Sequence, residues 1–430
     1  MNISNYEIVL NGSNEIMKSN LNNYKGSLAD LFYQSGGEDN LCFVSGQKPK
    51  LAFGPSDTLK QTWQDIDLAK IKRFCAKHQA KKNLIIGIFS YDLGLYLHGI
   101  NPKNKSGLPL AHLYAFENYL EEDDGIKITH KDPGYAAYVR DIASKPLKTG
   151  GEITLKKPFR PKWNKTGYRK AFSKAKEYIK DGDIYQINLS YPMFAKSNSA
   201  PADIFNRLLD KNRAVRAGFF DADDHQIISM SPETFINING RKILTFPIKG
   251  TRRRSPNVGD KAVIKQLLSD KKELAELNMI TDLLRNDLSI VCRPDSVKIK
   301  SKRKIAKLAR VIHTYSHIAG ELSPEVSTID ALLKMFPGGS ISGCPKKRAI
   351  EIIDELEDSA RGTYTGSLFS LEPNGNLEAN LLIRTIIKRG SELTLPVGGG
   401  IVYDSNSENE YQETIDKSLS ITSAFANNYK

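Results

Sequence analysis

Apolar residues recur at helical spacing in four segments of the chain. These segments are residues 165–180, 260–288, 345–357 and 408–425. In 260–288, for example, the apolar residues are three, four or seven positions apart, which places them on one side of an α-helix. Residues 345–357 begin with Pro345, a residue that suits the first turn of a helix. We therefore predict four amphipathic helices.

Short β-prone runs fill much of the remaining chain. The first 150 residues contain "NLCFVSG", "NLIIGIFSY" and "LAHLYAFENYL", and later parts contain "DGDIYQINLSYPMF", "NLLIRTIIKR" and "LTLPVGGGIVYD". Strands follow strands without a regular βαβ alternation. This order favours an α+β fold with large antiparallel sheets.

A connecting segment divides the chain into two regions. Residues 144–164, "SKPLKTGGEITLKKPFRPKWN", are rich in Pro, Gly and Lys. We predict an N-terminal region at 1–150 and a catalytic region at 163–425.

The charge of the chain bears on its partners. The formal net charge is +13, while 40% of the residues are hydrophobic and 26% are charged, as in a globular protein. The lysines are spread along the whole chain, with no RRM, KH or zinc-finger pattern, so we predict no nucleic-acid partner. A basic RNA-binding module remains the alternative from another class. A small anionic substrate suits a basic protein.

Other features concern the compartment. The four cysteines are scattered without a CxxC spacing, which favours a reducing environment. The first residues lack the pattern of a signal peptide, and Asp92 interrupts the most apolar stretch. We predict a cytoplasmic protein with no membrane segment.

Two of the predicted helices carry glutamates in the same arrangement. Glu273 and Glu276 are three residues apart, and Glu410, Glu413 and Lys417 follow at i, i+3 and i+7. Such pairs are common on solvated helix faces. The second set, however, follows the glycine run "VGGGIV" and a turn. Carboxylates from two helices, with no histidine between them, suit Mg²⁺ better than zinc or iron.

A lysine and a glutamate stand close together in the middle of the chain. Lys249 lies in "FPIKGTRRR", between a β-prone stretch and a glycine, just ahead of three arginines. A lysine amine crowded by cations can serve as a nucleophile. Glu233 in "SPETF" lies sixteen residues earlier, with β-like sequence between them. Adjacent strands of a hairpin would bring this acid and this amine to one cleft.

Three further features have both a structural and a functional interpretation. The Gly/Ser loop "FPGGSISGCPKK" runs into a helix N-terminus, where free backbone N–H groups can bind an anion. It does not match a nucleotide P-loop. His313 and Arg384 lie in apolar segments. A buried histidine is commonly structural, whereas a buried arginine needs a carboxylate partner.

Taken together, these stretches resemble the chorismate-utilising enzymes. This family comprises anthranilate synthase component I, aminodeoxychorismate synthase component I and the isochorismate or salicylate synthases. The matching motifs run in the family's order from about residue 165 to 420. They are "GDIYQINLS", "SPETF", "PIKGT", "KELAELNMITDLLRNDL", "PGGSISGCPKKRAIEIIDELE", "RGTYTGS", "LLIRT" and "GGGIVYDSNSENEYQETIDK". The resemblance implies a sandwich of large antiparallel sheets flanked by helices; the first 160 residues match only loosely.

Two positions distinguish the subfamilies. Gln186 stands where the isochorismate and salicylate synthases carry a water-activating lysine, which resembles the amine-transferring members. Lys249 stands where anthranilate synthases typically have alanine, and looks like the nucleophile of aminodeoxychorismate synthases. The resemblance therefore implies component I of aminodeoxychorismate synthase, an aminotransferase acting in para-aminobenzoate and folate biosynthesis. Anthranilate synthase component I is the nearest alternative.

The resemblance also implies roles for individual residues. Glu233 would be the general acid and base at the C4 hydroxyl of chorismate. Glu276 and Glu413 would bind Mg²⁺ directly, and Glu273 and Glu410 would bind it through water. The residues expected to bind substrate are Arg384 and Tyr364, the backbone of Gly398, Gly399 and Gly400, and Gln186, Thr251, His313, Ser340 and Lys417. Cys344 departs from the small residue usual at its position.

The chain shows no amidotransferase motif. We therefore expect ammonia to come from a separate glutamine amidotransferase subunit, component II. The resemblance also allows a tryptophan ligand in the N-terminal half, as an effector or as a structural fixture. Arg252, Arg253 and Arg254 receive no individual roles.

Overall fold

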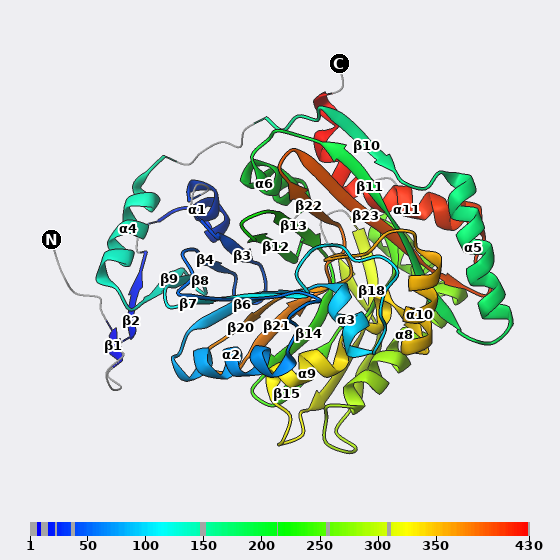
Figure 1. Ribbon diagram of the computed structural model, residues 1–430, viewed down its shortest axis with the longest axis horizontal. Coiled ribbons are helices and arrows are strands. Elements are labelled where there is room, and N and C mark those ends of the chain that lie inside the picture. The colour runs from blue at the N-terminus through cyan, green and yellow to red at the C-terminus, as the bar shows by residue number, and fades with distance from the viewer. Residues whose placement is uncertain are drawn as a thin grey trace.

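Two large antiparallel sheets form the body of the protein, and helices cover their outer faces (Figure 1). The computed structural model describes residues 7–9, 16–21, 24–35, 39–146, 152–212, 214–254, 259–307 and 311–428. The arrangement confirms the predicted α+β fold of large antiparallel sheets flanked by helices. Both sheets combine strands from residues 1–150 with strands from residues 163–425.

The larger sheet has thirteen strands within the described residues. In spatial order they are β1 (Glu7–Val9), β2 (Ile16–Asn20), β9 (Ile126–His130), β8 (Tyr119–Glu122), β4 (Lys50–Ala52), β3 (Cys42–Val44), β12 (Arg216–Asp221), β13 (Gln226–Ser231), β22 (Thr385–Arg389), β23 (Glu392–Val402), β11 (Gln186–Lys196) and β10 (Lys157–Pro161), with β19 (Gly343–Cys344) beside β11.

The smaller sheet has ten strands within the same described ranges. In spatial order they are β16 (Ile248–Arg253), β18 (Val311–Glu321), β15 (Lys242–Thr245), β14 (Thr234–Asn239), β21 (Leu377–Asn380), β20 (Ser367–Leu371), β6 (Leu84–Phe89), β7 (Ala111–Phe116) and β5 (Asp57–Gln61), with β17 (Lys298–Lys307) beside β18.

The helices pack on the outside of these sheets, with α2 and α9 below the smaller sheet and α5, α10 and α11 together at the right of Figure 1. They are α1 (Leu28–Gln34), α2 (Leu68–Ala80), α3 (Tyr91–Leu97), α4 (Pro133–Ser144), α5 (Lys165–Lys180), α6 (Pro201–Asn212), α7 (Gly259–Ser269), α8 (Lys271–Ser289), α9 (Thr328–Met335), α10 (Lys346–Leu356) and α11 (Ser407–Thr422). Two short 3₁₀ turns are η1 (Gly339–Ile341) and η2 (Ser423–Asn428).

The helices predicted from periodicity are present, with one correction. The segment 260–288 was predicted as one helix, but it forms two, α7 and α8. Asp270 has extended backbone, and its side chain accepts a hydrogen bond from the backbone N–H of Glu273 at 3.1 Å. This N-cap starts a new helix, because a capped first turn satisfies N–H groups that a continuous helix would bond internally. Glu273 therefore lies in the first turn of α8.

Strands β11 and β23 are paired over their full length and run beneath the candidate site. Asn188 lies opposite Gly400, and Ser190 lies opposite Gly398. Because side chains alternate between the faces of a strand, Gly398 and Gly400 share one face and Gly399 lies on the other. Apolar residues of these strands belong to the largest hydrophobic cluster of the protein. The glycine run is thus held on a rigid, buried sheet.

Candidate active site

The glycine run of β23 lets side chains from other elements come close to the sheet. A Cβ atom at Gly398 would lie 2.9 Å from the Tyr364 hydroxyl, and one at Gly400 would lie 3.7 Å from the Lys249 amine. A Cβ at Gly400 would also lie 3.4 Å from Nε2 of Gln186. Tyr364, Lys249 and Gln186 therefore converge on the same face of this strand.

Lys249 extends from β16 next to a backbone irregularity. The register between β16 and β18 shifts at Lys249, and Gly250 has a positive φ of 74°. The Thr314 hydroxyl donates a hydrogen bond to the backbone oxygen of Lys249. The Lys249 amine lies 3.7 Å from a carboxylate oxygen of Glu276, on α8. The bulge thus places the amine close to α8.

Glu233 lies at the start of β14, among cations. The Ser340 hydroxyl, in η1, donates a hydrogen bond to its carboxylate at 2.9 Å. Burial raises the pKa of Glu233, and the Ser340 hydrogen bond and the charges of Lys249, Lys417 and Arg384 oppose this rise. A carboxyl group with a raised pKa holds its proton more readily and can act as a general acid.

Arg384 and His313 form another part of the site. Arg384 has a positive φ of 51°, and its backbone oxygen accepts a hydrogen bond from the N–H of Met230 at 3.0 Å. Burial lowers the pKa of Arg384, and the charge of Glu233 opposes that change. Burial and the charge of Arg384 lower the pKa of His313 to about 4. His313 is therefore neutral at pH 7 and lies close to a guanidinium group that faces Glu233.

Helix α11 supplies the remaining predicted residues. The Lys417 amine donates a hydrogen bond to the Gly398 oxygen at 3.2 Å and pairs with Glu413 at 2.7 Å. Glu410 is buried and accepts a hydrogen bond from Ser405 at 2.7 Å. A Cβ at Gly399 would lie 3.8 Å from both Glu410 and Lys417. The first turns of α11 therefore cover the other face of the glycine run.

The donor chemistry of the glutamates fits Mg²⁺. Magnesium typically uses one or two carboxylates and keeps several waters. Within the described residues, no group of three His, Cys, Asp or Glu side chains is arranged to hold a metal ion. Glu273 instead pairs with Arg252 at 3.1 Å, as Glu276 does with Lys249 and Glu413 with Lys417. Three of the four glutamates thus face cations of the chain itself, and Glu410 accepts a hydrogen bond from Ser405.

Gln186, on the same face of the glycine run as Lys249, is a candidate ligand-binding residue. Its side chain is buried, yet neither its amide nitrogen nor its amide oxygen has a hydrogen-bond partner. Buried polar groups are normally paired, and an unpaired one calls for an explanation. A substrate bound beside Lys249 would supply the missing partner.

The structure brings most of the predicted site residues together. Lys249, Lys417, Arg384 and Ser340 all act on Glu233, and Gln186 and Tyr364 lie on the same glycine face as Lys249. Thr251 pairs with His313 through the backbone of β16 and β18, and its side chain lies outside the described ones.

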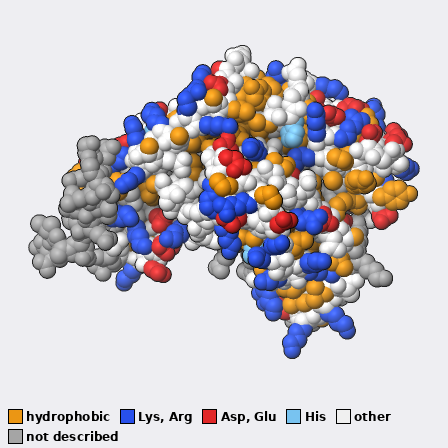
Figure 2. Space-filling view, turned by 90° about the horizontal axis from the view of Figure 1, so that it is seen from below, with side chains coloured by type: hydrophobic (Ala, Val, Ile, Leu, Met, Phe, Trp, Pro, Cys, Tyr) orange, Lys and Arg blue, Asp and Glu red, His pale blue; other side chains and the backbone are white. Residues whose placement is uncertain are grey.

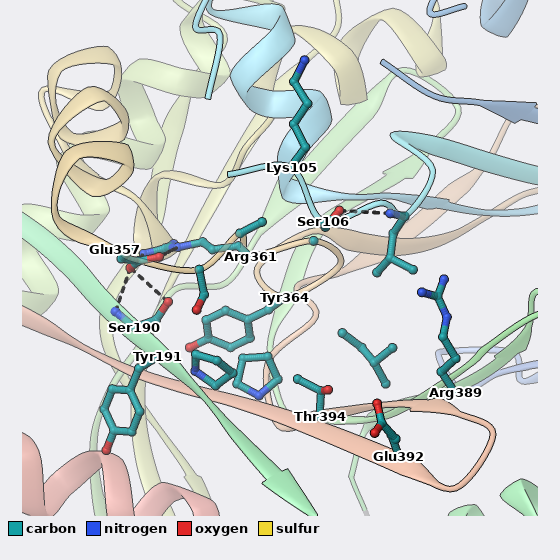
Figure 3. Close-up of a pocket in the computed structure, with 17 residues that line it drawn as sticks. Lys105, Ser106, Ser190, Tyr191, Glu357, Arg361, Tyr364, Arg389, Glu392 and Thr394 are labelled. Atoms are coloured by element: carbon teal, nitrogen blue, oxygen red, sulfur yellow. Dashed lines mark hydrogen bonds and ion pairs between the residues drawn. The ribbon is translucent and has the colours of Figure 1, made fainter. Parts of the chain in front are cut away.

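Sequence reasoning missed one group that supports the site. Arg361 and Glu357 form a buried ion pair at 2.7 Å, and Glu357 also accepts hydrogen bonds from the backbone N–H and the hydroxyl of Ser190 (Figure 3). Arg361 is the first residue of the "RGTYTGS" motif, so the resemblance pointed to the right segment. Its partner Glu357 ends the "PGGSISGCPKKRAIEIIDELE" motif, but the motifs do not show that the two side chains form a buried pair.

Comparison with known proteins identifies the family. The model of the chorismate binding enzyme family matches residues 29–423. The chain is 34% identical over 361 residues to aminodeoxychorismate synthase component 1 of Bacillus subtilis (strain 168), covering 79% of this chain and 76% of that protein. It is also 34% identical over 366 residues to anthranilate synthase component 1 of Cereibacter sphaeroides, covering 79% and 73%.

A solved structure agrees with these relatives. The crystal structure of anthranilate synthase component I from Streptococcus pneumoniae TIGR4 superposes with a TM-score of 0.77 at 29% identity, covering 87% of this chain and 92% of that one. The chain therefore belongs to the chorismate binding enzyme family and is a chorismate-utilising enzyme. Enzymes of this family typically depend on Mg²⁺. This assignment replaces the RNA-binding alternative.

The charge of the surface and the character of the helices are two further features of the molecule. Lys and Arg side chains are spread over most of the face shown in Figure 2, with acidic side chains among them. No helix within the described ranges combines the length and the apolar character needed to cross a membrane.

Proposed function

We propose that this protein is component I of an aminodeoxychorismate synthase. The observation that carries the proposal is the position of Lys249: its amine lies on the same face of the glycine run as Gln186 and Tyr364 and acts on Glu233. The relatives named for the para-amino and ortho-amino reactions are equally similar to the chain, at 34% identity. The choice between the two reactions therefore rests on this lysine.

The proposed chemistry has two substitutions. In the first, the uncharged amine of Lys249 forms a bond to C2 of chorismate, the two ring double bonds shift, and the C4 hydroxyl leaves as water. Glu233 donates the proton that this hydroxyl needs. In the second, ammonia forms a bond to C4, the two double bonds shift back, and the C2–N bond to Lys249 breaks. The sum is chorismate plus ammonia giving 4-amino-4-deoxychorismate plus water.

The other residues bind and orient the substrate in this proposal. Arg384 and Tyr364 hold the enolpyruvyl carboxylate, together with the backbone of the glycine run at 398–400. Gln186 pairs with the bound ring through its unpartnered amide. Glu276 and Glu413 would hold Mg²⁺, which would neutralise the ring carboxylate. Direct attack of ammonia at C2 would instead give the ortho product, the anthranilate outcome.

The identity of the product tests this proposal. The purified chain is incubated with chorismate, Mg²⁺ and an ammonium salt, and the product is identified by mass spectrometry and by its NMR spectrum. We expect 4-amino-4-deoxychorismate. Anthranilate as the sole product would contradict the proposal and favour the alternative.

The source of ammonia is proposed to be a glutamine amidotransferase subunit. The relatives are named as component 1 of their enzymes, which supports a second component. We expect the chain alone to use ammonium but not glutamine, and to use glutamine once such a subunit is added. Turnover of glutamine by the chain alone, at the rate seen with ammonium, would contradict this.

A further inference from the structure

The guanidinium group of Arg361 has a hydrogen-bond acceptor for each of its donors. An arginine side chain carries five N–H groups in a planar fork. Two of them bind the carboxylate of Glu357, at 2.9 and 2.7 Å. The others bind the backbone oxygens of Asn188 at 2.6 Å and Ile341 at 3.0 Å and the hydroxyl of Thr365 at 3.3 Å. Both Arg361 and Glu357 are buried.

These acceptors belong to three segments that each carry a residue of the candidate site. Asn188 lies two residues after Gln186 on β11, so both side chains point to the same face. Ile341 follows Ser340, which donates to Glu233. Thr365 follows Tyr364, and the guanidinium carbon lies 6.0 Å from the ring centre of Tyr364. One side chain thus connects the segments that carry Gln186, Ser340 and Tyr364.

Glu357 extends this connection by two further hydrogen bonds. Besides Arg361, its carboxylate accepts hydrogen bonds from the backbone N–H and the hydroxyl of Ser190, at 2.8 and 3.0 Å. Ser190 lies opposite Gly398, at the start of the glycine run. On its other side, the guanidinium group lies 4.7 Å from the ring centre of Tyr91. The pair is therefore held by hydrogen bonds to several segments and by the ring of Tyr91.

We propose that Arg361, held by Glu357, is a positioning residue that sets the relative placement of Gln186, Ser340 and Tyr364 for the reaction of chorismate. The inference rests on the proposed function only in that these three residues act on bound chorismate. Lysine cannot replace Arg361, because an ammonium group has three donors and no planar fork. The proposed positioning depends on the hydrogen bonds of the guanidinium group and not on its positive charge alone.

The surroundings of Arg361 allow a direct test by chemical rescue. Arg361 lines a cavity of about 310 Å³ that Tyr364, Ser190 and Glu357 also line (Figure 3). In Arg361→Ala, free guanidinium from the solvent can occupy the place of the deleted group. We expect kcat/KM for chorismate, measured as chorismate consumed with ammonium present, to fall at least about 100-fold, because small displacements of reacting groups cost about that much.

The rescue distinguishes positioning from general loss of structure. Millimolar guanidinium should restore the rate of Arg361→Ala at least about tenfold through the same planar hydrogen bonds, and urea at equal concentration should not. Arg348→Ala is the matched control: Arg348 makes partly exposed ion pairs with Asp183 and Glu351, so its loss should leave the rate within about twofold and insensitive to guanidinium.

A second variant keeps the test decisive if Arg361→Ala does not fold. Arg361→Lys keeps the charge, and we expect kcat to fall about tenfold or more with a smaller change in KM. Wild-type kcat in Arg361→Lys, or a folded Arg361→Ala that keeps its rate or ignores guanidinium, would overturn the proposal. Because consumption of chorismate is measured, a wild-type enzyme that makes anthranilate would refute the proposed function without affecting this result.

Discussion

Two ion pairs support the candidate site in opposite ways. The amine of Lys249 lies 3.7 Å from Glu276, and the two side chains are 24% and 21% exposed. Arg361 and Glu357 are joined by two hydrogen bonds, with side chains 2% and 5% exposed. The first pair has a long contact and is partly exposed to solvent. The second pair is buried and joined by two hydrogen bonds.

The two pairs suit different roles in the candidate site. A nucleophile has to lose its proton and move toward the substrate, so a long, partly exposed contact suits Lys249. A supporting group has to stay in place, and a planar guanidinium with all donors satisfied does so. The proposed nucleophile thus belongs to the loosely paired, partly exposed contact, and Arg361 and Glu357 form a buried pair with two hydrogen bonds.

The largest expected effect is a difference in the free energy of unfolding that is lost when each pair is broken. Glu357→Gln leaves a buried guanidinium without its counter-charge and should lower the free energy of unfolding by about 3–5 kcal/mol. Glu276→Gln breaks a partly exposed pair and should cost less than about 1 kcal/mol. Urea unfolding of both variants measures this. Equal losses would show that the two pairs do not differ as described.

The next effect concerns activity: Glu276→Gln, the variant with the smaller loss of stability, should lose much of its turnover. Glu276→Gln and Glu413→Gln each remove a proposed Mg²⁺ ligand and should lower turnover at limiting Mg²⁺ at least about 100-fold while the fold is kept. Glu392→Gln, on an exposed ion pair with Lys196 at the far end of β23, is the control and should remain active. Full activity of either variant at limiting Mg²⁺ would contradict the metal assignment.

The smallest effect is a shift in the pH dependence of turnover, which tests the proposed acid–base role of Glu233. Glu233 must be protonated to release the C4 hydroxyl, so turnover should fall as the pH rises through its raised pKa. The Ser340 hydrogen bond favours the charged carboxylate, so Ser340→Ala should move this falling limb to higher pH by about one unit. Ser342→Ala, in the same loop but bonded to Gly338, should not move it. If turnover of Ser340→Ala falls at the same pH as that of the wild-type enzyme, Ser340 does not influence the pKa of Glu233.

Much of this arrangement could be predicted from local sequence. Helical periodicity gave α5, α10 and α11 nearly to their ends, and the family motifs gave the residues that surround Glu233. Local patterns could not show that Asp270 caps a new helix, because capping and helix interior are both compatible with aspartate there. They also could not show the bonds of Arg361, since its acceptors at Asn188 and Ile341 come from distant parts of the chain.

The most direct measurement of the central claim looks for a covalent bond to Lys249. The enzyme is mixed with chorismate and Mg²⁺ without ammonia, quenched rapidly and analysed by peptide mass spectrometry. The account predicts an adduct equal in mass to chorismate minus water on the peptide that contains "FPIKGT", and no such adduct in Lys249→Ala. It also predicts that Lys249→Ala loses most formation of 4-amino-4-deoxychorismate. Production of this compound by Lys249→Ala at nearly the wild-type rate would contradict the account.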